Sequence, residues 1–285
     1  LWQQENVPAV EVQSDAPAWY NPNRILSVSE FATWSDVVAW AQPLYDQAAV
    51  VDPSVQQLAD QLAAGKDPAG KVVAALHFVQ QEIRYLGMED GIGSHRPRKA
   101  ADTLYRRYGD CKDKTVLLMA LLKAMGFAPT AALVSLEQGE SLPNQQPSPY
   151  LFNHVIVTLL LDGKRVWLDG TELNQGDNLQ TIAVPYLRYA LLLEHGSSAL
   201  TPMDGEYRAS DVTVRHEIWV QSDQNRLAVE TQYQGQMAEQ QRSQWLLATP
   251  QSISRRFEEY YGRIYGDIES IGVPTVIDDR QQNRL

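Results

Sequence analysis

The single cysteine of the chain, Cys111, lies in the run Tyr-Gly-Asp-Cys-Lys-Asp-Lys at residues 108–114 and is the first candidate for chemistry. A lone cysteine can form neither an internal disulfide nor a multi-cysteine zinc site, so its role is packing or reactivity. Asp110 is a favoured N-cap residue, and Asp113 three positions later suggests a capping box. We therefore expect Cys111 in the first turn of a helix, where the helix dipole and unpaired N–H groups stabilise a thiolate.

Two lysines in the same turn favour a reactive cysteine over a buried structural one. Lys112 and Lys114 lie at the positive end of the expected helix, where cations are disfavoured. A local rule broken in this way is typical of a functional site. We expect both ammonium groups to help hold a thiolate or an oxyanion.

A thiol nucleophile needs a base, and the base needs an orienting group. Among five histidines, His154 opens a β-rich run that reaches Leu161, followed by Asp162-Gly163 and a return strand to Asp169. Asp-Gly is a strong signal for a two-residue hairpin turn. Each residue alone favours a structural reading, with His154 at a strand start and Asp169 as a turn former.

The hairpin register brings these two side chains together. With a two-residue turn, Leu161 faces Lys164, so Asp169 faces Ile156 and His154 faces Thr171. His154 and Asp169 are then diagonal neighbours about 7–8 Å apart, within reach of their side chains. The opposite face is expected to be the core face, which leaves the pair on the face not devoted to apolar packing; it carries Val155, Val157, Leu159, Val166 and Leu168.

Cysteine at a helix start, then histidine on one strand and aspartate after the next, resembles the transglutaminase-like superfamily. The matching segments are residues 109–114, Asn153-His154-Val155 and residues 167–171, and the runs 83–89 and 97–100 resemble its bacterial branch. The resemblance covers about residues 35–205. It implies an α+β fold, with a papain-like nucleophile helix packed on an antiparallel sheet and a C-terminal β-rich module.

By this resemblance Cys111 is the nucleophile, His154 the general base and Asp169 the residue that orients the imidazole. The Cys111 N–H is one expected oxyanion-hole donor, and Tyr85 and Gln81 are candidates for a second. The implied reaction is acyl transfer on a protein or peptide amide through a thioester, with hydrolysis favoured over cross-linking. No cofactor and no metal is expected.

Two other functions are compatible with the same residues. The first is a catalytically inactive domain that binds a peptide, a glycan or a protein, although an intact Cys, His and Asp argues against it. The second is a zinc site made by Cys111, His154 and Asp169, which is weaker because structural zinc usually takes more sulfur or nitrogen ligands.

The composition narrows the range of partners. The net charge of −11 argues against nucleic acid and anionic membranes as partners, and no run of 18 apolar residues predicts a membrane span. Relatives in the bacterial branch are commonly exported, so we expect a periplasmic or extracellular protein. The chain starts without Met and reads as part of a longer protein.

The length of 285 residues predicts about two domains. We expect an N-terminal arm or tail of an upstream domain at 1–34, a catalytic domain at 35–205 and a truncated β-rich module at 206–285. Expected helices are one capped by Ser35, two at 53–64 and 68–84, and one at 238–263; a hairpin pairs 212–220 with 226–233. The loop 137–150 is expected to border substrate, and the C-terminal module to be structural or to bind a protein partner.

Overall fold

The structure is a computed structural model that describes the chain apart from residues 1, 2, 4, 8, 12, 18, 24, 88–90, 185–186, 204–210 and 223, and the side chains of 91 and 92. The expected boundary at 205/206 therefore lies outside the described residues, as do the last two residues of the 83–89 motif. The described residues before Ser29 form no helix or strand, and the Ser29 hydroxyl donates to the Pro147 carbonyl at 2.5 Å.

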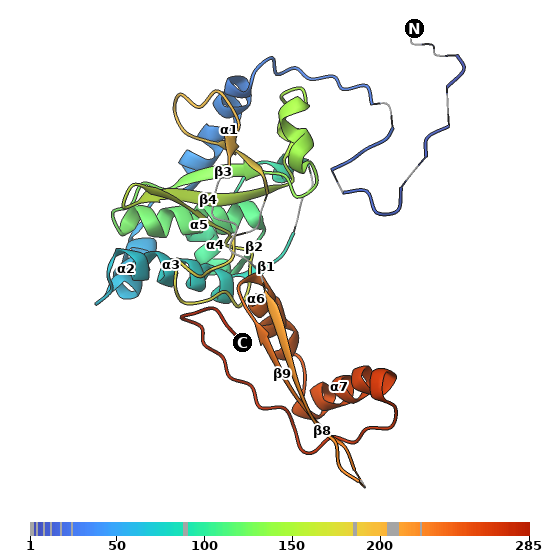
Figure 1. Cartoon of the computed structure of the whole chain (residues 1–285). Coiled ribbons are helices and arrows are strands. Elements are labelled where there is room, and N and C mark those ends of the chain that lie inside the picture. The colour runs from blue at the N-terminus through green and yellow to red at the C-terminus, as the bar shows by residue number, and fades with distance from the viewer. Residues whose placement is uncertain are drawn as a thin grey trace.

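The N-terminal half is helical and contains one short parallel pair of strands, the second of which directly precedes the helix that begins at Cys111 (Figure 1). Its elements are α1 (Trp34–Ala48), α2 (Pro53–Ala63), α3 (Pro68–Glu82), β1 (Arg84–Tyr85), η1 (Gly91–Ser94), α4 (Ala100–Arg106), β2 (Tyr108–Gly109) and α5 (Cys111–Ala124). The expected helices at 53–64 and 68–84 are confirmed, each capped by an aspartate and opened by proline. The expected Ser35 cap is wrong, because the N-cap is Thr33, two residues earlier, which forms a capping box with Asp36.

A five-stranded antiparallel sheet follows in the order β5-β4-β3-β6-β7. Its elements and connecting turns are β3 (Thr130–Val134), η2 (Gly139–Asn144), η3 (Pro149–Leu151), β4 (His154–Leu161), β5 (Lys164–Leu168), β6 (Tyr189–Leu192) and β7 (Thr201–Pro202). Helix α5 packs along β4, and the α+β fold expected from the sequence is confirmed.

The hairpin register is confirmed. Leu161 pairs with Lys164 and Val157 with Leu168. Asp162 and Gly163 have φ values of 50° and 75°, as a primed two-residue turn requires.

The main apolar core lies between the helices and one face of this sheet. Every residue of α5 from Cys111 to Leu122 is buried, and Val155, Val157, Leu159 and Leu168 of the hairpin belong to the same cluster, as expected. The opposite face is less polar than expected, because a second, smaller apolar cluster covers it; it contains Ala132, Val134, Ile156, Trp167, Ala190, Leu192 and Met203.

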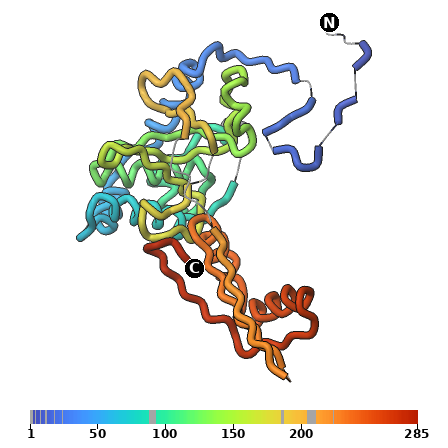
Figure 2. The backbone as a smooth tube through the Cα atoms, viewed as in Figure 1, coloured from blue at the N-terminus to red at the C-terminus, as the bar shows by residue number. Residues whose placement is uncertain are grey.

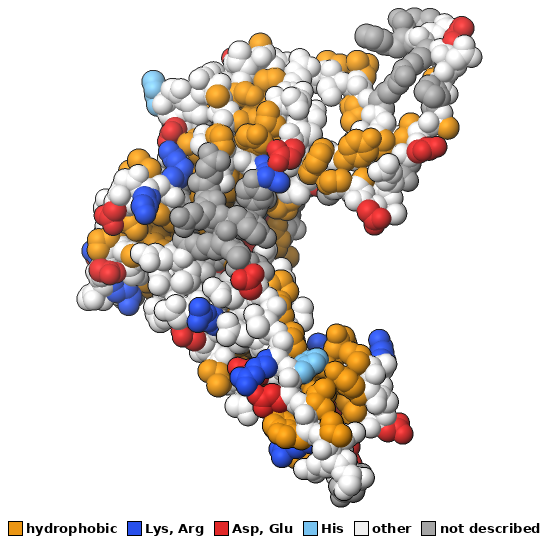
Figure 3. Space-filling view, viewed as in Figure 1, with side chains coloured by type: hydrophobic (Ala, Val, Ile, Leu, Met, Phe, Trp, Pro, Cys, Tyr) orange, Lys and Arg blue, Asp and Glu red, His pale blue; other side chains and the backbone are white. Residues whose placement is uncertain are grey.

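The C-terminal part projects from this core as a hairpin with two helices, and the chain then returns to the junction (Figure 2). Strands β8 (Val212–Trp219) and β9 (Arg226–Tyr233) pair as expected, and α6 (Gln236–Trp245) and α7 (Pro250–Tyr265) follow. The single helix expected at 238–263 is wrong, since Thr249 caps a new helix that starts at Pro250. Figure 3 shows apolar side chains over the hairpin and α7, where Trp219, Tyr260, Ile264 and Tyr265 are exposed.

Candidate active site

Cys111 is the first residue of α5 and is 4% exposed. The Asp110 carboxylate caps the helix by accepting hydrogen bonds from the N–H groups of Lys112 at 2.9 Å and Asp113 at 3.2 Å. The expected N-cap is confirmed. At the first helical position the Cys111 N–H has no acceptor within its own helix, so it can serve an oxyanion.

The expected capping box is incomplete, because Asp113 turns away from the helix start. Its carboxylate accepts from the Arg98 N–H at 2.7 Å and from the Arg98 guanidinium at 2.8 Å. Arg98 comes from the run 97–100, so this part of the motif anchors the first turn of α5. The contact spans 15 residues and lies beyond what helix-capping rules can predict.

Lys112 and Lys114 each bind a partner other than the thiol. The Lys112 ammonium pairs with Asp110 at 2.8 Å, and the Lys114 ammonium donates to the Ile83 carbonyl at 2.7 Å. Burial lowers the pKa of Lys114 to about 8 against the opposing charge of Asp169. Both lysines therefore brace the start of the helix, and the expectation that they also hold a thiolate or an oxyanion stays a prediction.

His154 and Asp169 meet as the hairpin register predicts. His154 is the first residue of β4, and Asp169 follows the last residue of β5. The His154 Nε2 lies 2.7 Å from Oδ2 of Asp169. Cys111 lines the same cavity as His154 and helps to raise the pKa of its imidazole. Because Nε2 faces Asp169, Nδ1 is the nitrogen left for the thiol.

Charges and hydrogen bonds fix the protonation of this pair. Burial lowers the pKa of His154, but hydrogen bonds and charges from Asp169 and Cys111 outweigh it and raise the pKa to about 10. Burial raises the pKa of Asp169, but hydrogen bonds from His154 and Thr171 outweigh that effect and hold it below its usual range. The other oxygen of Asp169 accepts from the Thr171 N–H at 2.8 Å and hydroxyl at 2.7 Å. The pair is therefore a charged imidazolium–carboxylate.

A cavity of about 230 Å³ opens at Cys111 and His154. Its wall is aromatic: Trp40 lies edge-on to His95, and His95 edge-on to Tyr150, each with ring centroids 5.2 Å apart. Burial, and next the charge of Lys112, lower the pKa of His95. The loop expected to border substrate does reach this cavity, through Pro149 and Tyr150.

The two candidates for a second oxyanion-hole donor lie apart from this cavity. Tyr85 is 49% exposed on β1, paired in register with Gly109. Gln81 is exposed on α3. Neither is among the described residues that line the cavity, so both stay predictions.

Sequence reasoning missed Gln80, the buried neighbour of Gln81, which donates to the Asp169 carbonyl at 2.8 Å. A signal was present, because Gln80 continues the helical spacing of Val72 and Leu76 and so is a polar residue in an apolar stripe. Glu172 was missed too. Burial first, and then the charges of Asp169 and Glu239, raise its pKa to about 7.

A cysteine at a helix start that lines one cavity with a histidine, itself paired with an aspartate, is the arrangement that thiol enzymes use. Residues 56–167 match the model of the transglutaminase-like superfamily. This match confirms, for this part of the chain, the resemblance found in the sequence. The match includes Cys111 and His154 and ends two residues before Asp169.

Solved structures of two candidate proteases are similar to the chain. One, from Parabacteroides distasonis, is 16% identical with a TM-score of 0.44 over 59% of this chain and 31% of its own. A candidate cysteine protease from Cytophaga hutchinsonii is 15% identical with a TM-score of 0.34, over 65% of this chain and 63% of its own. The chain thus spans about a third of one neighbour and under two thirds of the other, and TM-scores this low carry no weight. No curated protein matches the chain.

Within the described ranges, no helix is long and apolar enough to cross a membrane. The same residues hold no group of three or more His, Cys, Asp and Glu side chains placed to bind a metal ion.

Proposed function

We propose that the chain is a thiol-dependent amide hydrolase in which Cys111, His154 and Asp169 act as nucleophile, acid–base and orienting group. The single observation that carries this proposal is the position of His154, which is hydrogen-bonded to Asp169 at 2.7 Å and lines one cavity with Cys111. Proximity of this kind converts a weak nucleophile into an activated one.

The proposed chemistry takes two steps. The Cys111 sulfur attacks the amide carbonyl carbon, and the oxyanion formed accepts from the Cys111 N–H. When the C–N bond breaks, the His154 imidazolium gives its proton to the leaving amine and a thioester remains. His154 then takes a proton from water, the hydroxyl attacks the thioester carbonyl, and the acid and the thiol are released. Asp169 keeps the imidazole in one tautomer throughout.

The aromatic wall of the cavity favours substrates with an aromatic or large apolar side chain beside the scissile amide. Among the described residues lining the cavity, Lys112 carries an ammonium group and no residue is a carboxylate; that ammonium is already paired with Asp110. Acidic and basic side chains would therefore enter without a free partner of opposite charge.

Fluorogenic peptide amides with Phe, Ala, Lys or Glu on the acyl side test both parts of the proposal. We expect kcat/KM to be highest for Phe, by about tenfold or more over Lys and Glu, and to vanish in Cys111→Ser. With methylamine added, the free acid should remain the main product; a methylamide as the main product would instead establish transfer.

Alkylation separates an inactive domain from an active enzyme with an unknown substrate. Iodoacetamide should modify the wild type rapidly at pH 6, where ordinary thiols react slowly. His154→Ala should react about 100-fold more slowly, since it lacks the imidazole. Equally slow alkylation of both proteins, together with no turnover, would instead favour a catalytically inactive domain that binds a partner.

A further inference from the structure

Beneath Asp169 lies a set of polar side chains that the proposed chemistry does not use. Gln80, Gln175, Glu239 and Asn283 are between 0% and 4% exposed, although they come from α3, a loop, α6 and the C-terminal end of the chain. Buried polar groups cost free energy unless they are hydrogen-bonded, so such a set must be paired internally.

The first contacts run from Asp169 to the loop that follows it, here called the Asp169 loop (residues 169–183). The Gln80 amide nitrogen donates both to the Asp169 carbonyl at 2.8 Å and to Oε1 of Gln175 at 2.7 Å. The Gln175 amide nitrogen then donates to the Ala183 carbonyl at 2.7 Å and to Glu239 at 3.2 Å. The Asp169 end of the loop is therefore held by Gln80 and the Ala183 end by Gln175, and the two glutamines are hydrogen-bonded to each other.

The next contacts run from the loop to the C-terminal end. Oε1 of Glu239 accepts from the Ala183 N–H at 3.0 Å and from the Asn283 amide at 2.7 Å. The same Asn283 nitrogen donates to the Thr181 carbonyl at 2.8 Å, and its oxygen accepts from Arg242 at 2.6 Å. Asn283 has a φ of 52°, a left-handed conformation that asparagine tolerates better than most residues.

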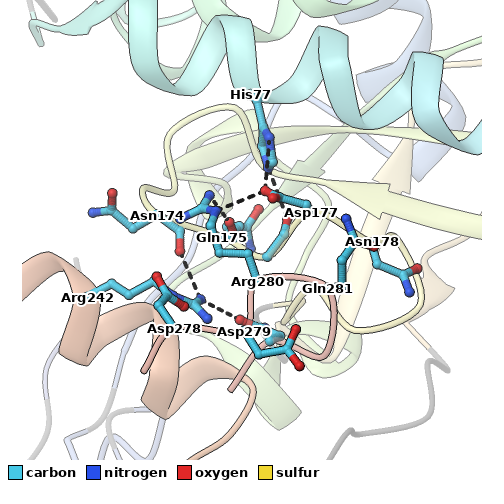
Figure 4. Close-up of polar contacts among 12 residues, drawn as sticks. His77, Asn174, Gln175, Asp177, Asn178, Arg242, Asp278, Asp279, Arg280 and Gln281 are labelled. Carbon is cyan, nitrogen blue, oxygen red and sulfur yellow. Dashed lines mark hydrogen bonds and ion pairs between the residues drawn. The ribbon is translucent and has the colours of Figure 1, made fainter. Parts of the chain in front are cut away.

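An outer layer of ion pairs covers these contacts (Figure 4). The Arg280 guanidinium donates to Asp177 at 3.0 Å and to the Gln175 carbonyl at 2.6 Å, while His77 of α3 contacts the Gly176 carbonyl at 3.0 Å. A Cβ added to Gly176 would lie 2.9 Å from the Arg280 carbonyl, so the two backbones pack closely.

One feature of Gln80 argues against a purely stabilising role. Its Oε1 is buried and accepts no hydrogen bond from any described residue. An unpaired buried acceptor destabilises the folded state, because it has lost its hydrogen bonds to water. The amide cannot be turned round to relieve it, because the atoms that face its nitrogen are both acceptors, the Asp169 carbonyl and Oε1 of Gln175.

We propose that α6 and residues 278–285 form a C-terminal clamp that positions Asp169 against His154, with Gln80, Gln175, Glu239 and Asn283 as positioning residues. This inference rests on the proposed function of Asp169. It makes the C-terminal part a component of the catalytic unit. Loosening the clamp should lower kcat by misplacing the carboxylate, while the cavity at Cys111 and the KM of the substrate stay as they are.

Asn283→Asp tests the clamp with a minimal change of shape. The substitution keeps the acceptor for Arg242 and tolerates the left-handed backbone, but it removes the donors to Glu239 and Thr181 and puts two carboxylates side by side. We expect kcat for a fluorogenic Phe amide to fall about 10- to 100-fold with KM within about threefold. Adding Glu239→Gln to Asn283→Asp should restore part of kcat, because it removes one of the two adjacent negative charges.

Asn178→Asp is the matched control, since it introduces the same negative charge within the Asp169 loop. The side-chain oxygen of Asn178 accepts only a local hydrogen bond, from the Gln180 N–H at 2.9 Å. This control should leave kcat within about twofold. The imidazole ¹H–¹⁵N signals of His154 give a readout that needs no turnover: Asn283→Asp should shift them and Asn178→Asp should not. Unchanged kcat and signals in Asn283→Asp, or a loss of thermal stability alone, would overturn the clamp. A wild type without turnover would refute the proposed function, and the His154 signals would still decide the clamp.

Discussion

At the Cys111 end of the site, polar support comes from contacts of shorter sequence span, such as the 15 positions between Arg98 and Asp113 and the 31 between Ile83 and Lys114. Asp110 caps the helix, and α5 is buried continuously from Cys111 to Leu122 in the main core. At the Asp169 end, support comes from polar side chains of α3, α6 and the chain end, up to 114 positions away at Asn283. The Cys111 end is thus held by the apolar core and by hydrogen bonds of shorter sequence span. The Asp169 end is held by more distant hydrogen bonds, which are directional and can be removed one at a time.

The largest expected effect comes from Asp169→Asn, which tests the hydrogen-bonded end directly. The amide keeps the shape of the carboxylate but cannot stabilise the imidazolium, and it favours the wrong tautomer of His154. We expect kcat to fall on the order of 10⁴-fold. The fold should persist, since α5 and its core are untouched; circular dichroism and thermal unfolding check this. Activity within tenfold of the wild type would remove Asp169 from the site.

A pair of glycine substitutions compares the two ends for tolerance to crowding. A Cβ at Gly109 would lie 2.5 Å from the Cβ of Asp113, which is held in place because the Asp113 carboxylate binds Arg98. A Cβ at Gly170 would lie 3.2 Å from Cγ1 of Val79. We expect Gly109→Ala to reduce the free energy of unfolding by about 3 kcal/mol and Gly170→Ala by about 1 kcal/mol. Urea unfolding measures both, and equal losses would contradict the idea that the Cys111 end is the less yielding.

The smallest expected effect depends on pH and concerns Glu172, whose pKa of about 7 exceeds the usual 4.5. The folded protein binds this proton more tightly than the unfolded chain, so its stability falls as the pH rises from about 4.5 through 7. Glu172→Gln should therefore raise the free energy of unfolding by about 1–3 kcal/mol at pH 8 and leave it nearly unchanged at pH 4. The control is Glu137→Gln, at an exposed turn, which should change neither value. A gain of the same size at both pH values would rule out titration of Glu172.

Features that depend on neighbouring residues could be predicted from the sequence, whereas contacts between distant segments could not. The Asp110 cap, the start of α5 and the Asp162-Gly163 turn depend on neighbouring residues, and all three were predicted; the turn alone brought His154 and Asp169 together. The partner of Asp113 and the contacts of Gln80 with Asp169 join segments whose proximity no local pattern reveals. The prediction of one helix over 238–263 is wrong for a different reason. Thr249-Pro250 is itself a helix-start signal, so the sequence alone was enough to predict a new helix at Pro250.

The large sequence separation between Asp169 and Asn283 also has a consequence for synthesis. Chains fold from the N-terminus as they leave the ribosome, so α5 and the β4–β5 hairpin can assemble while the residues that close over the Asp169 loop have not yet been made. A chain at that stage would hold its nucleophile and base but an unsupported aspartate. For the proposed amide hydrolase, this delay would keep a nascent molecule inactive until the residues up to Asn283 have been made.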